Sequence, residues 1–416
     1  MIAPRADAVR ARAHELDACT ETPGEITRSY GSDALVEARE RVRGWLEQAG
    51  LEVRQDAVGN LVGRREADAP GSPTLVLASH VDSVRNAGRW DGPLGVLVAI
   101  AAAQRLEDEG IALPYALEVV AFVDEEGLAY AASYLGSRVW AGIWDGAERG
   151  THDRAGTPFE AAVRRMGGDV DGFAEARRDP ADLLGYLELH IEQGPVLEDE
   201  GLPVGVVTAI AGQSRGFVDV LGVAGHAGNT PMRLRRDALA AAAELVLAVE
   251  QLALEPDGPT ATVGKLEVSP NVGNVIPGVV TLSYDVRHQD DAAKDAAVER
   301  LRVIAEEVCA RRGLTHVWRH LQDHPATPMA PRLRALLVAA VEQAGIRPVE
   351  LPSGAGHDAV SAAHLTDVSM LFVRCRGGVS HHPDEHVDEA DVDAAVRVVD
   401  AFLDLLADDV RARGEA

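Results

Sequence analysis

The stretch TLVLASHVDSVRNAGRWDGPLGVLVAIAAAQRL, residues 74–106, does most to determine what kind of fold this chain can adopt. It begins with Thr74–Ala78, which is apolar on both faces, as a buried strand in the centre of a sheet would be. It ends with Leu94–Leu106, an alanine-rich apolar segment that predicts a helix. Strands that alternate with helices in this way indicate an α/β layer architecture.

The same alternation continues on both sides of this stretch. A segment with helical spacing at residues 35–50 ends at Gly50, which is a plausible C-terminal cap. Apolar runs around it predict short strands, and the last ninety residues return to helix, strand and helix. The predicted strands are Leu51–Arg54, Asn60–Gly63, Leu117–Phe122 and Met370–Val373, and the predicted later helices are Pro331–Ala344 and Ala390–Leu406.

The pattern changes near Gly212, where six elements follow in the order β-α-β-β-α-β, which is the signature of a ferredoxin-like unit. They are Phe217–Val223, Asp237–Leu254, Ala261–Val268, Val279–Arg287, Asp291–Arg312 and Leu314–His320. The simplest interpretation is one α/β domain formed by residues 1–212 and 328–416, interrupted by a smaller domain at residues 213–327.

Composition excludes several classes of function. The 416 residues carry 66 acidic and 40 basic side chains, a formal charge of −26, which repels nucleic acid and anionic membranes. Three widely spaced cysteines form neither a disulfide framework nor a thiolate metal site. The first residues lack the apolar core of a signal peptide, and no run approaches the ~20 apolar residues that span a bilayer. We therefore expect a cytoplasmic protein that binds neither nucleic acid nor membrane.

Side chains able to bind metal lie at the ends of the predicted strands. His80 lies two residues after the end of the predicted strand Thr74–Ala78. Asp82, two residues further on, is placed to accept the second ring N–H of His80. Asp91 comes eleven residues after His80, in a glycine-flanked turn before the helix, where its two oxygens could bridge two ions. Later segments deliver Glu125-Glu126, His190 and His381.

Each of these residues alone is more often structural or solvent-exposed than functional. Together, His80, Asp91, Glu126, His190 and His381 form an imidazole–carboxylate set without thiolates, which suits Zn²⁺ or Mn²⁺. One bridging aspartate, two histidines on one ion and a glutamate with a histidine on the other would leave room for a water molecule. The spacing therefore favours a centre with two divalent ions.

Seven ordered motifs resemble one family of enzymes. They are ASHVDSVRNAGRWDGPLGV (78–96), VDEEG (123–127), LELHIEQGPVLE (187–198), GHAGNTPMRLRRDAL (225–239), NVIPG (274–278), SGAGHDA (353–359) and GGVSHHPDE (377–385). The chain resembles the metal-dependent amidase/hydantoinase/carbamoylase family within the dinuclear metallopeptidases, from about Ile26 to Leu406. The resemblance implies a mixed-sheet dinuclear metallohydrolase domain with an inserted ferredoxin-like domain that acts as a lid and in dimerisation.

The resemblance also implies roles for the residues at the strand ends. His80 and His190 would bind one ion, Glu126 and His381 the other, and Asp91 both. Glu125 would be the general base. His382 competes with His381 for the ligand role, but His381 stands in the family register after Gly-Val-Ser. Besides Zn²⁺ and Mn²⁺, the two ions per subunit could be Co²⁺ or Ni²⁺.

By the same resemblance, substrate contacts come largely from the inserted domain. His226 would stabilise the oxyanion, reaching the partner subunit's site, although a turn histidine without catalytic role is the alternative. Arg287 would bind the substrate carboxylate, with a salt bridge to a lid carboxylate as the alternative. Further polar contacts would come from Gln213, Asn274, His357 and the backbone of Gly354–Gly356, in particular Gly356.

These expectations describe an amidohydrolase that cleaves a ureido or amide C–N bond of a small carboxylated substrate. Within the family the motifs look most like those of allantoate amidohydrolases, which release ammonia and carbon dioxide and give ureidoglycolate or its aminated precursor. The alternatives are an N-carbamoyl-L-amino-acid hydrolase or a related amidase and, more distantly, a dipeptidase or a non-catalytic binding protein. The segment Leu128-Ala129-Tyr130 departs from the family pattern, so we expect it to reshape the pocket. A homodimer through the lid is expected from the resemblance alone.

Overall fold

The computed structural model describes residues 4–130 and 132–414, which form two compact units. The first unit contains the described residues up to Thr208, Met329–Leu351 and the chain from Gly356 onward. The second unit contains Ala209–Pro328 and the short segment Pro352–Ala355. The assignment of residues 213–327 to a separate lid domain, and of residues 1–212 and 328–416 to a catalytic domain, stays a prediction.

The first unit is a mixed α/β structure, as the sequence predicts. Its main strands are β1 (Glu52–Gln55), β2 (Leu61–Arg65), β3 (Thr74–His80), β4 (Ala116–Phe122), β5 (Leu183–Ile191), β6 (Val204–Ile210), β15 (Glu350–Ser353) and β16 (Val368–Val373). Its helices are α1 (Pro4–Leu16), α2 (Asp33–Gln48), α3 (Pro93–Asp108), α4 (Leu135–Ala141), α5 (Phe159–Arg165), α6 (Val196–Asp199), α9 (Pro331–Gln343), α10 (Ala359–Ala362) and α11 (Glu389–Arg413). Short 3₁₀ turns occur at Val170–Ala176, Pro180–Asp182 and Arg376–Gly378.

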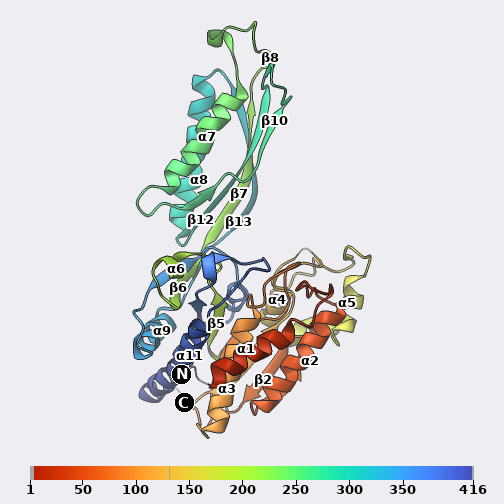
Figure 1. Cartoon of the computed structure of the whole chain (residues 1–416), viewed down its shortest axis with the longest axis vertical. Helices are drawn as coiled ribbons and strands as arrows, with labels where there is room; N and C mark the ends of the chain where they lie inside the picture. The colour runs from red at the N-terminus through yellow and green to blue at the C-terminus, as the bar shows by residue number, and fades with distance from the viewer. Residues whose placement is uncertain (1–3, 131, 415–416) are drawn as a thin grey trace. The chain divides into compact units, whose positions relative to one another are not determined.

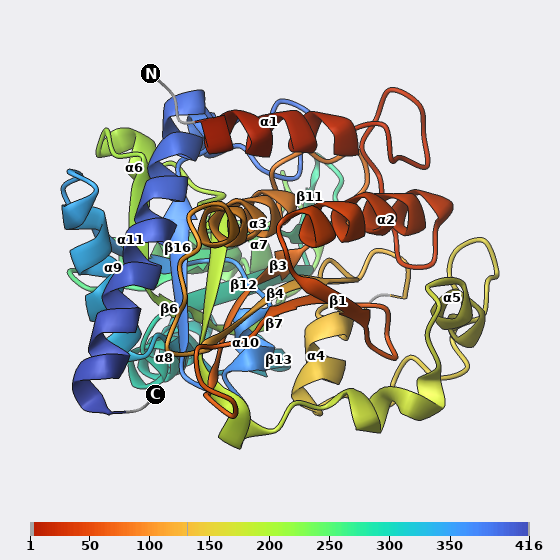
Figure 2. The same cartoon turned by 90° about the horizontal axis from the view of Figure 1, so that it is seen from below.

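The strands follow the order β1-β2-β4-β3-β5-β16-β6. The four central strands β4, β3, β5 and β16 run parallel, whereas β1, β2 and β6 pair antiparallel with their neighbours. Helices α1, α2, α3 and α11 lie on one side of the sheet, and α4 and α10 lie on the other (Figure 2). Because both faces are covered, β3 and β4 are buried along their whole length, which fits their largely apolar sequences.

The parallel strands determine where polar side chains can meet. Parallel pairing places His80 opposite Phe122 and His190 opposite Phe372, so all four carboxyl ends meet at one edge of the sheet. Helix α3 begins at the same edge, with Gly92 before its first turn and Pro93 at its first position, and packs on β3, β4 and β5. This edge is where open α/β sheets bind ligands.

The second unit is a sheet with two helices packed on one face (Figure 1). Its elements are β7 (Gly212–Leu221), β8 (Gly225–His226), a 3₁₀ turn at Met232–Leu234, α7 (Ala238–Ala253), β9 (Thr260–Thr262), β10 (Leu266–Ser269), β11 (Val275–Ile276), β12 (Val279–His288), α8 (Asp291–Arg311), β13 (Thr315–His324) and β14 (Thr327–Pro328). The strand order is β10-β12-β7-β13, with β9 also paired to β12. Buried and half-buried residues alternate along β7 because its even-numbered side chains pack against the helices.

The strand predicted at Ala261–Val268 is two strands, β9 and β10. The strand is interrupted at Gly264-Lys265. There the backbone N–H of Lys265 donates to the hydroxyl of Ser283, and the carbonyl of Lys265 accepts the backbone N–H of Ser283. The assignment of this unit to the ferredoxin-like class stays a prediction. No helix in the described part of the chain has the length and apolar character needed to cross a bilayer.

Candidate metal centre

The carboxyl edge of the parallel strands brings the five predicted ligands together. His80 ends β3, His190 lies near the end of β5, Glu126 follows β4, and His381 follows β16. Asp91 reaches the same place from the turn before α3. We call these five residues together with Glu125 the His–carboxylate cluster. Within it, three overlapping sets have ligand atoms all within 4.8 Å of one another: His80 with Asp91 and His190; His80 with Glu125 and Glu126; and Asp91 with Glu126 and His381.

The two oxygens of Asp91 face different sides of this cluster. Oδ1 lies 3.1 Å from Nε2 of His190 and 3.7 Å from Nε2 of His80. Oδ2 lies 3.1 Å from Nε2 of His381, which in turn lies 3.4 Å from Oε1 of Glu126. A carboxylate that divides its oxygens between two groups of ligands has the arrangement that a bridge between two cations requires.

The hydrogen bonding of His190 tests whether a cation fits between these atoms. Its Nδ1 lies 2.9 Å from the carbonyl oxygen of Ile191, so Nδ1 carries the proton and donates it. In the neutral ring Nε2 is then a lone pair, and it faces both Asp91 Oδ1 and Nε2 of His80, which is 3.3 Å away. A divalent metal ion between these atoms would satisfy all of them at once, so the site can accommodate one.

Electrostatics leads to the same conclusion. Seven carboxylates in this region are at most 7% exposed: Asp82, Asp91, Asp124, Glu125, Glu188, Asp358 and Glu385. Burying so many acidic groups is costly unless cations neutralise them. Burial alone lowers the pKa of His190, but the Asp91 carboxylate outweighs it, so the pKa of His190 lies above its ordinary value. The cluster therefore attracts positive charge strongly.

Glu125 is held in the cluster by backbone contacts of its loop. Its N–H donates to Oδ1 of Asp82 and the N–H of Glu126 donates to Oδ2, both at 3.1 Å. Burial raises the pKa of Glu125 well above its ordinary value, and the Glu126 carboxylate adds to this although His80 opposes it. A carboxylate with a raised pKa can accept a proton near neutral pH and later return it.

Asp82 was predicted to accept the second ring N–H of His80. The two groups are 3.6 Å apart, which is an ion-pair distance longer than a hydrogen bond. The two oxygens of Asp82 instead accept the backbone N–H groups of Glu125 and Glu126. Asp82 therefore lies between a predicted ligand and the predicted base and orients the loop that carries the base.

His381, rather than His382, faces the cluster. His381 has a left-handed backbone, with φ of 56°, which directs its ring toward Asp91. The ring of His382 is more than half exposed, lies 3.6 Å from Asp384 and accepts the N–H of that residue. The geometry thus favours His381 over His382 as the metal ligand, as the family resemblance implies.

Gly356 and His357 lie in the first unit, close to the cluster. His357 is buried, and its ring packs edge-on against His190 with 4.5 Å between centroids. Burial lowers the pKa of His357 well below its ordinary value, so the ring is neutral. A Cβ at Gly356 would lie 1.9 Å from the hydroxyl of Tyr134, so only glycine fits beneath this phenol.

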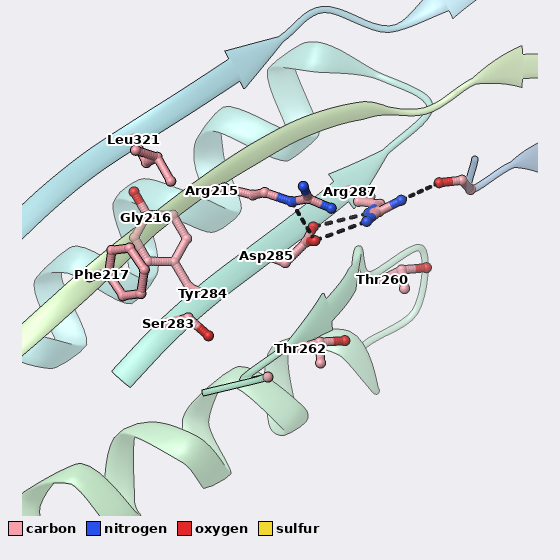
Figure 3. A pocket seen from close by; sticks show the side chains of 12 residues that line it. Arg215, Gly216, Phe217, Thr260, Thr262, Ser283, Tyr284, Asp285, Arg287 and Leu321 are labelled. Carbon is pink, nitrogen blue, oxygen red and sulfur yellow. Dashed lines mark hydrogen bonds and ion pairs between the residues drawn. The ribbon is translucent and has the colours of Figure 1, made fainter. Parts of the chain in front are cut away.

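Gln213 and Arg287 meet on the sheet of the second unit. Arg287 donates to both oxygens of Asp285, at 3.0 and 2.9 Å, and to the carbonyl oxygen of Gly354. Arg215 donates to the same carboxylate at 2.8 Å, and the amide of Gln213 lies 3.3 Å from it. Figure 3 shows Arg215 and Arg287 converging on Asp285 at the wall of a cavity of about 440 Å³. Arg287 thus makes the salt bridge to a carboxylate of its own unit that was the alternative to substrate binding. Because two guanidinium groups face one carboxylate, the wall of the cavity keeps a net positive charge.

His226 and Asn274 lie elsewhere in the second unit, where β8 pairs with β11. The Nδ1 of His226 accepts the N–H groups of Gly228 and Asn229, at 3.1 and 3.2 Å, so Nε2 carries the ring proton when the ring is neutral. The carbonyl of Asn274 accepts the N–H of Ala227 in the same loop. The exposed ring is thus a fixed hydrogen-bond donor.

Three residues of the site were missed by the sequence analysis: Gln193, Ser380 and Glu385. All three contact Asp91, and all three lie inside the quoted motifs LELHIEQGPVLE and GGVSHHPDE. Their polarity was visible in the sequence. Their direction was not, because it depends on left-handed turns at Gln193 and His381.

Comparisons with known proteins agree with this geometry. Residues 76–405 match peptidase family M20/M25/M40, and the chain belongs to that family. Allantoate deiminase of Arabidopsis thaliana is 38% identical over 96% of this chain and 82% of its own length. N-carbamoyl-L-amino acid amidohydrolase of Geobacillus stearothermophilus is 38% identical over 90% of this chain and 92% of its own length. A solved amidase of the hydantoinase/carbamoylase family from Burkholderia multivorans superimposes with a TM-score of 0.89 at 33% identity, covering 96% of this chain and 97% of the other. The chain is a hydrolase that acts on C–N amide bonds.

Proposed function

We propose that this enzyme uses two divalent metal ions to hydrolyse a ureido C–N bond of a small carboxylated substrate, and that the substrate is allantoate. The observation that carries the proposal is the division of the Asp91 oxygens, 3.1 Å from His190 on one side and 3.1 Å from His381 on the other. In this proposal His80 and His190 hold one ion, Glu126 and His381 hold the second, and Asp91 joins them. Zn²⁺ or Mn²⁺ suits these ligands, and Co²⁺ or Ni²⁺ can replace them.

The bound ions would polarise the substrate carbonyl and lower the pKa of water toward neutrality. The protein's own residues then carry the remaining steps. Glu125 takes a proton from the attacking water and delivers it to the departing nitrogen. Asp82 holds Glu125 in place through the backbone of its loop. His226 donates a hydrogen bond from Nε2 to the oxyanion. Arg287 is paired with Asp285 and Gly354, and it attracts the substrate carboxylate through the positive charge of the cavity wall that it forms with Arg215.

Sheet geometry supports a dimer in which His226 comes from the partner subunit. Gln213 pairs with Arg287 at one end of the β7–β12 ladder, and Leu221 pairs with Val279 at the other, next to the loop of His226. Eight residue steps along a strand span roughly 27 Å, which is much longer than a small ureido acid. His226 and Arg287 of one protomer therefore cannot both touch one substrate molecule, whereas a symmetric dimer can bring together residues from its two subunits.

A substrate panel tests the proposed reaction. The purified enzyme, with Mn²⁺ or Zn²⁺, is assayed on allantoate, on N-carbamoyl-L-amino acids and on dipeptides. Ammonia release from allantoate with the highest kcat/KM supports the proposal. Preference for an N-carbamoyl amino acid, which the similarity to the carbamoylase relative makes the second candidate, would refute allantoate but keep the reaction class. Turnover of dipeptides alone would refute both.

The role of Glu125 is tested by Glu125→Gln, which keeps the shape but cannot accept the proton. We expect kcat to fall by about 10²- to 10⁴-fold while both ions stay bound, because a general base contributes about that much. Glu40→Gln on the exposed surface of α2 is the matched control and should leave kcat unchanged. Native turnover in Glu125→Gln would show that another group is the base.

Mixing two inactive variants tests the proposed dimer. Protomers with Glu125→Gln and protomers with His226→Ala are unfolded or dissociated together and reassembled. If His226 acts on the partner's site, each mixed dimer has one intact site, and random pairing returns roughly a quarter of native activity. If His226 acts within its own subunit, or if the protein is a monomer, the mixture stays inactive.

A further inference from the structure

Two neutral donors hold one oxygen of the proposed bridging carboxylate. The side-chain nitrogen of Gln193 and the hydroxyl of Ser380 each lie 2.9 Å from Oδ2 of Asp91. The same nitrogen of Gln193 lies 3.2 Å from the hydroxyl of Ser380. Asp91 is only 3% exposed, so water does not compete freely for this oxygen. The carboxylate is an acceptor only, which requires that the nitrogen of the Gln193 amide, and not its oxygen, faces it.

The backbone of Asp91 is held by a separate contact. Oε1 of Glu385 accepts the N–H groups of Trp90 and Asp91, at 2.7 and 3.1 Å. Oε2 of Glu385 lies 3.3 Å from the Ser380 hydroxyl. With its backbone fixed in this way, the remaining freedom of Asp91 is rotation of its carboxylate, and the donors on Oδ2 act on that rotation.

Gln193 reaches Asp91 because its backbone is in an uncommon conformation. Its φ is 56°, in the left-handed region that residues other than glycine rarely adopt. The preceding residue, Glu192, anchors the turn: its N–H donates to the carbonyl of Val373, and its carboxylate accepts the N–H groups of Val196 and Leu197. Backbone strain of this kind persists where the surrounding structure imposes it, and it is concentrated at functional sites.

Carboxylate rotation decides whether Asp91 can bridge. The terminal torsion of aspartate is broad, so an unrestrained carboxylate samples many orientations. With Oδ2 held on the His381 side, Oδ1 is left facing His80 and His190. Amide and hydroxyl donors restrict this rotation without adding charge, so they leave the attraction of the cluster for cations intact.

We propose that Gln193 is a positioning residue that keeps the Asp91 carboxylate in its bridging orientation and thereby sets the affinity for the second metal ion. The inference rests on the two-ion centre of the proposed function and adds a residue to it. Gln193 acts through Asp91 and also lies next to His381, whose Nε2 is 3.4 Å from its side-chain nitrogen. Ser380 shares the contact, and Glu385 fixes the backbone beneath it.

The test measures metal binding by protein stripped of metal, titrated with Mn²⁺ alone by calorimetry, so it is independent of the substrate. Gln193→Met keeps the length of the side chain and removes both donors. We expect the first ion to bind as in the native protein and the second to bind about 10- to 100-fold more weakly, the usual effect of losing a partner of a metal ligand. The absorption spectrum of the Co²⁺-loaded variant should also change, because ligand geometry changes.

Two further variants separate the effect of the Gln193 amide from the effect of backbone strain and from the general effect of losing such a hydrogen bond. Gln193→Gly removes the amide and relieves the left-handed strain, and it should show the same weakening as Gln193→Met. Gln104→Met, which removes a similar amide–carboxylate hydrogen bond at the far end of α3, should bind both ions normally. Native affinity for both ions in Gln193→Met and in Gln193→Gly would overturn the inference. Failure of the native protein to bind two ions would refute the proposed centre itself, and with it this role of Gln193.

Discussion

Replacing Gly92 by alanine should disrupt the His–carboxylate cluster, because the added methyl group meets the ring of His80. Gly92 separates Asp91 from α3 and has φ of 83° and ψ of −62°. A Cβ at this position would lie 2.4 Å from Cε1 and Nδ1 of His80 and 2.6 Å from its Nε2. The methyl group would therefore occupy space that the imidazole ring now fills.

The expected cost has two parts. An alanine held in this backbone region is strained by about 1–3 kcal/mol. The contact adds a further cost of about 1–3 kcal/mol, typical of overpacking in a dense interior. To restore normal carbon contacts of about 3.5 Å, the His80 ring must move by roughly 1 Å. That shift is about half the length of a metal–nitrogen bond, so His80 could no longer hold an ion.

Urea unfolding and metal titration measure the two consequences. Tryptophan fluorescence reports mainly on the first unit, which contains Trp45, Trp90, Trp140 and Trp144, whereas only Trp318 lies in the second. Gly71→Ala is the matched control, because Gly71 has φ of 82° and no atom within 4 Å of its Cβ position.

The control isolates the backbone cost, about 1–2 kcal/mol, and should bind metal normally. Gly92→Ala should lose more stability than the control and bind less than the native number of ions. If Gly92→Ala matches Gly71→Ala in stability and binds metal like the native protein, then the contact with His80 does not determine the site.

Three further predictions concern metal, pocket and substrate. Exhaustive chelation should abolish hydrolysis and added Mn²⁺ or Zn²⁺ should restore it, whereas full activity in protein shown by elemental analysis to lack metal would contradict the two-ion centre. Gly356→Ala should lower the free energy of unfolding by about 1–3 kcal/mol, because its Cβ would lie 1.9 Å from the Tyr134 hydroxyl. Adding Tyr134→Phe should recover part of that loss, and equal stability of the single and double variants would contradict the contact. Arg287→Lys should raise KM about 10- to 100-fold with a smaller effect on kcat, because the single ammonium group of lysine cannot hold Asp285 and attract the substrate carboxylate at the same time; an unchanged KM would exclude this role.

The centre of the fold was predictable because its sequence has few alternatives. The predicted strand Thr74–Ala78 is the first part of β3, and the predicted helix Leu94–Leu106 lies within α3. Both are mostly apolar, with Thr74, Gln104 and Arg105 the exceptions, so burial on most sides follows from composition. Helix α1 was not predicted, although its buried residues Ala6, Val9, Ala13 and Leu16 have helical spacing. The apolar residues there are small and separated by charged ones, so the signal is weak.

The identity of the ligands was predictable, but the contacts that orient them were not. Residues at the ends of parallel strands must share one edge of the sheet, whatever the loops do. The partners of Asp91 come from positions 102 to 294 residues further along the chain, and nothing in local spacing says which side chain will reach it. The sequence also could not predict that Asp82 accepts the backbone N–H of Glu125 and not the ring N–H of His80. A difference of about half an ångström between the two groups decides between an ion pair and a hydrogen bond.

Three loops at this edge share one unusual feature. Asp124, Gln193 and His381, which follow β4, β5 and β16, are all residues other than glycine with φ between 56° and 57°. Asp124 precedes Glu125, Gln193 contacts Asp91, and His381 is itself a member of the His–carboxylate cluster. Neighbouring contacts hold these turns; for example, the N–H of Leu135 donates to the carbonyl of Asp124. A glycine at any of these positions would relieve the strain but would give up the side chain or the rigidity of the turn. Strain kept at three strand ends at once is best explained by the need to aim side chains at one point, because folding alone would favour its removal.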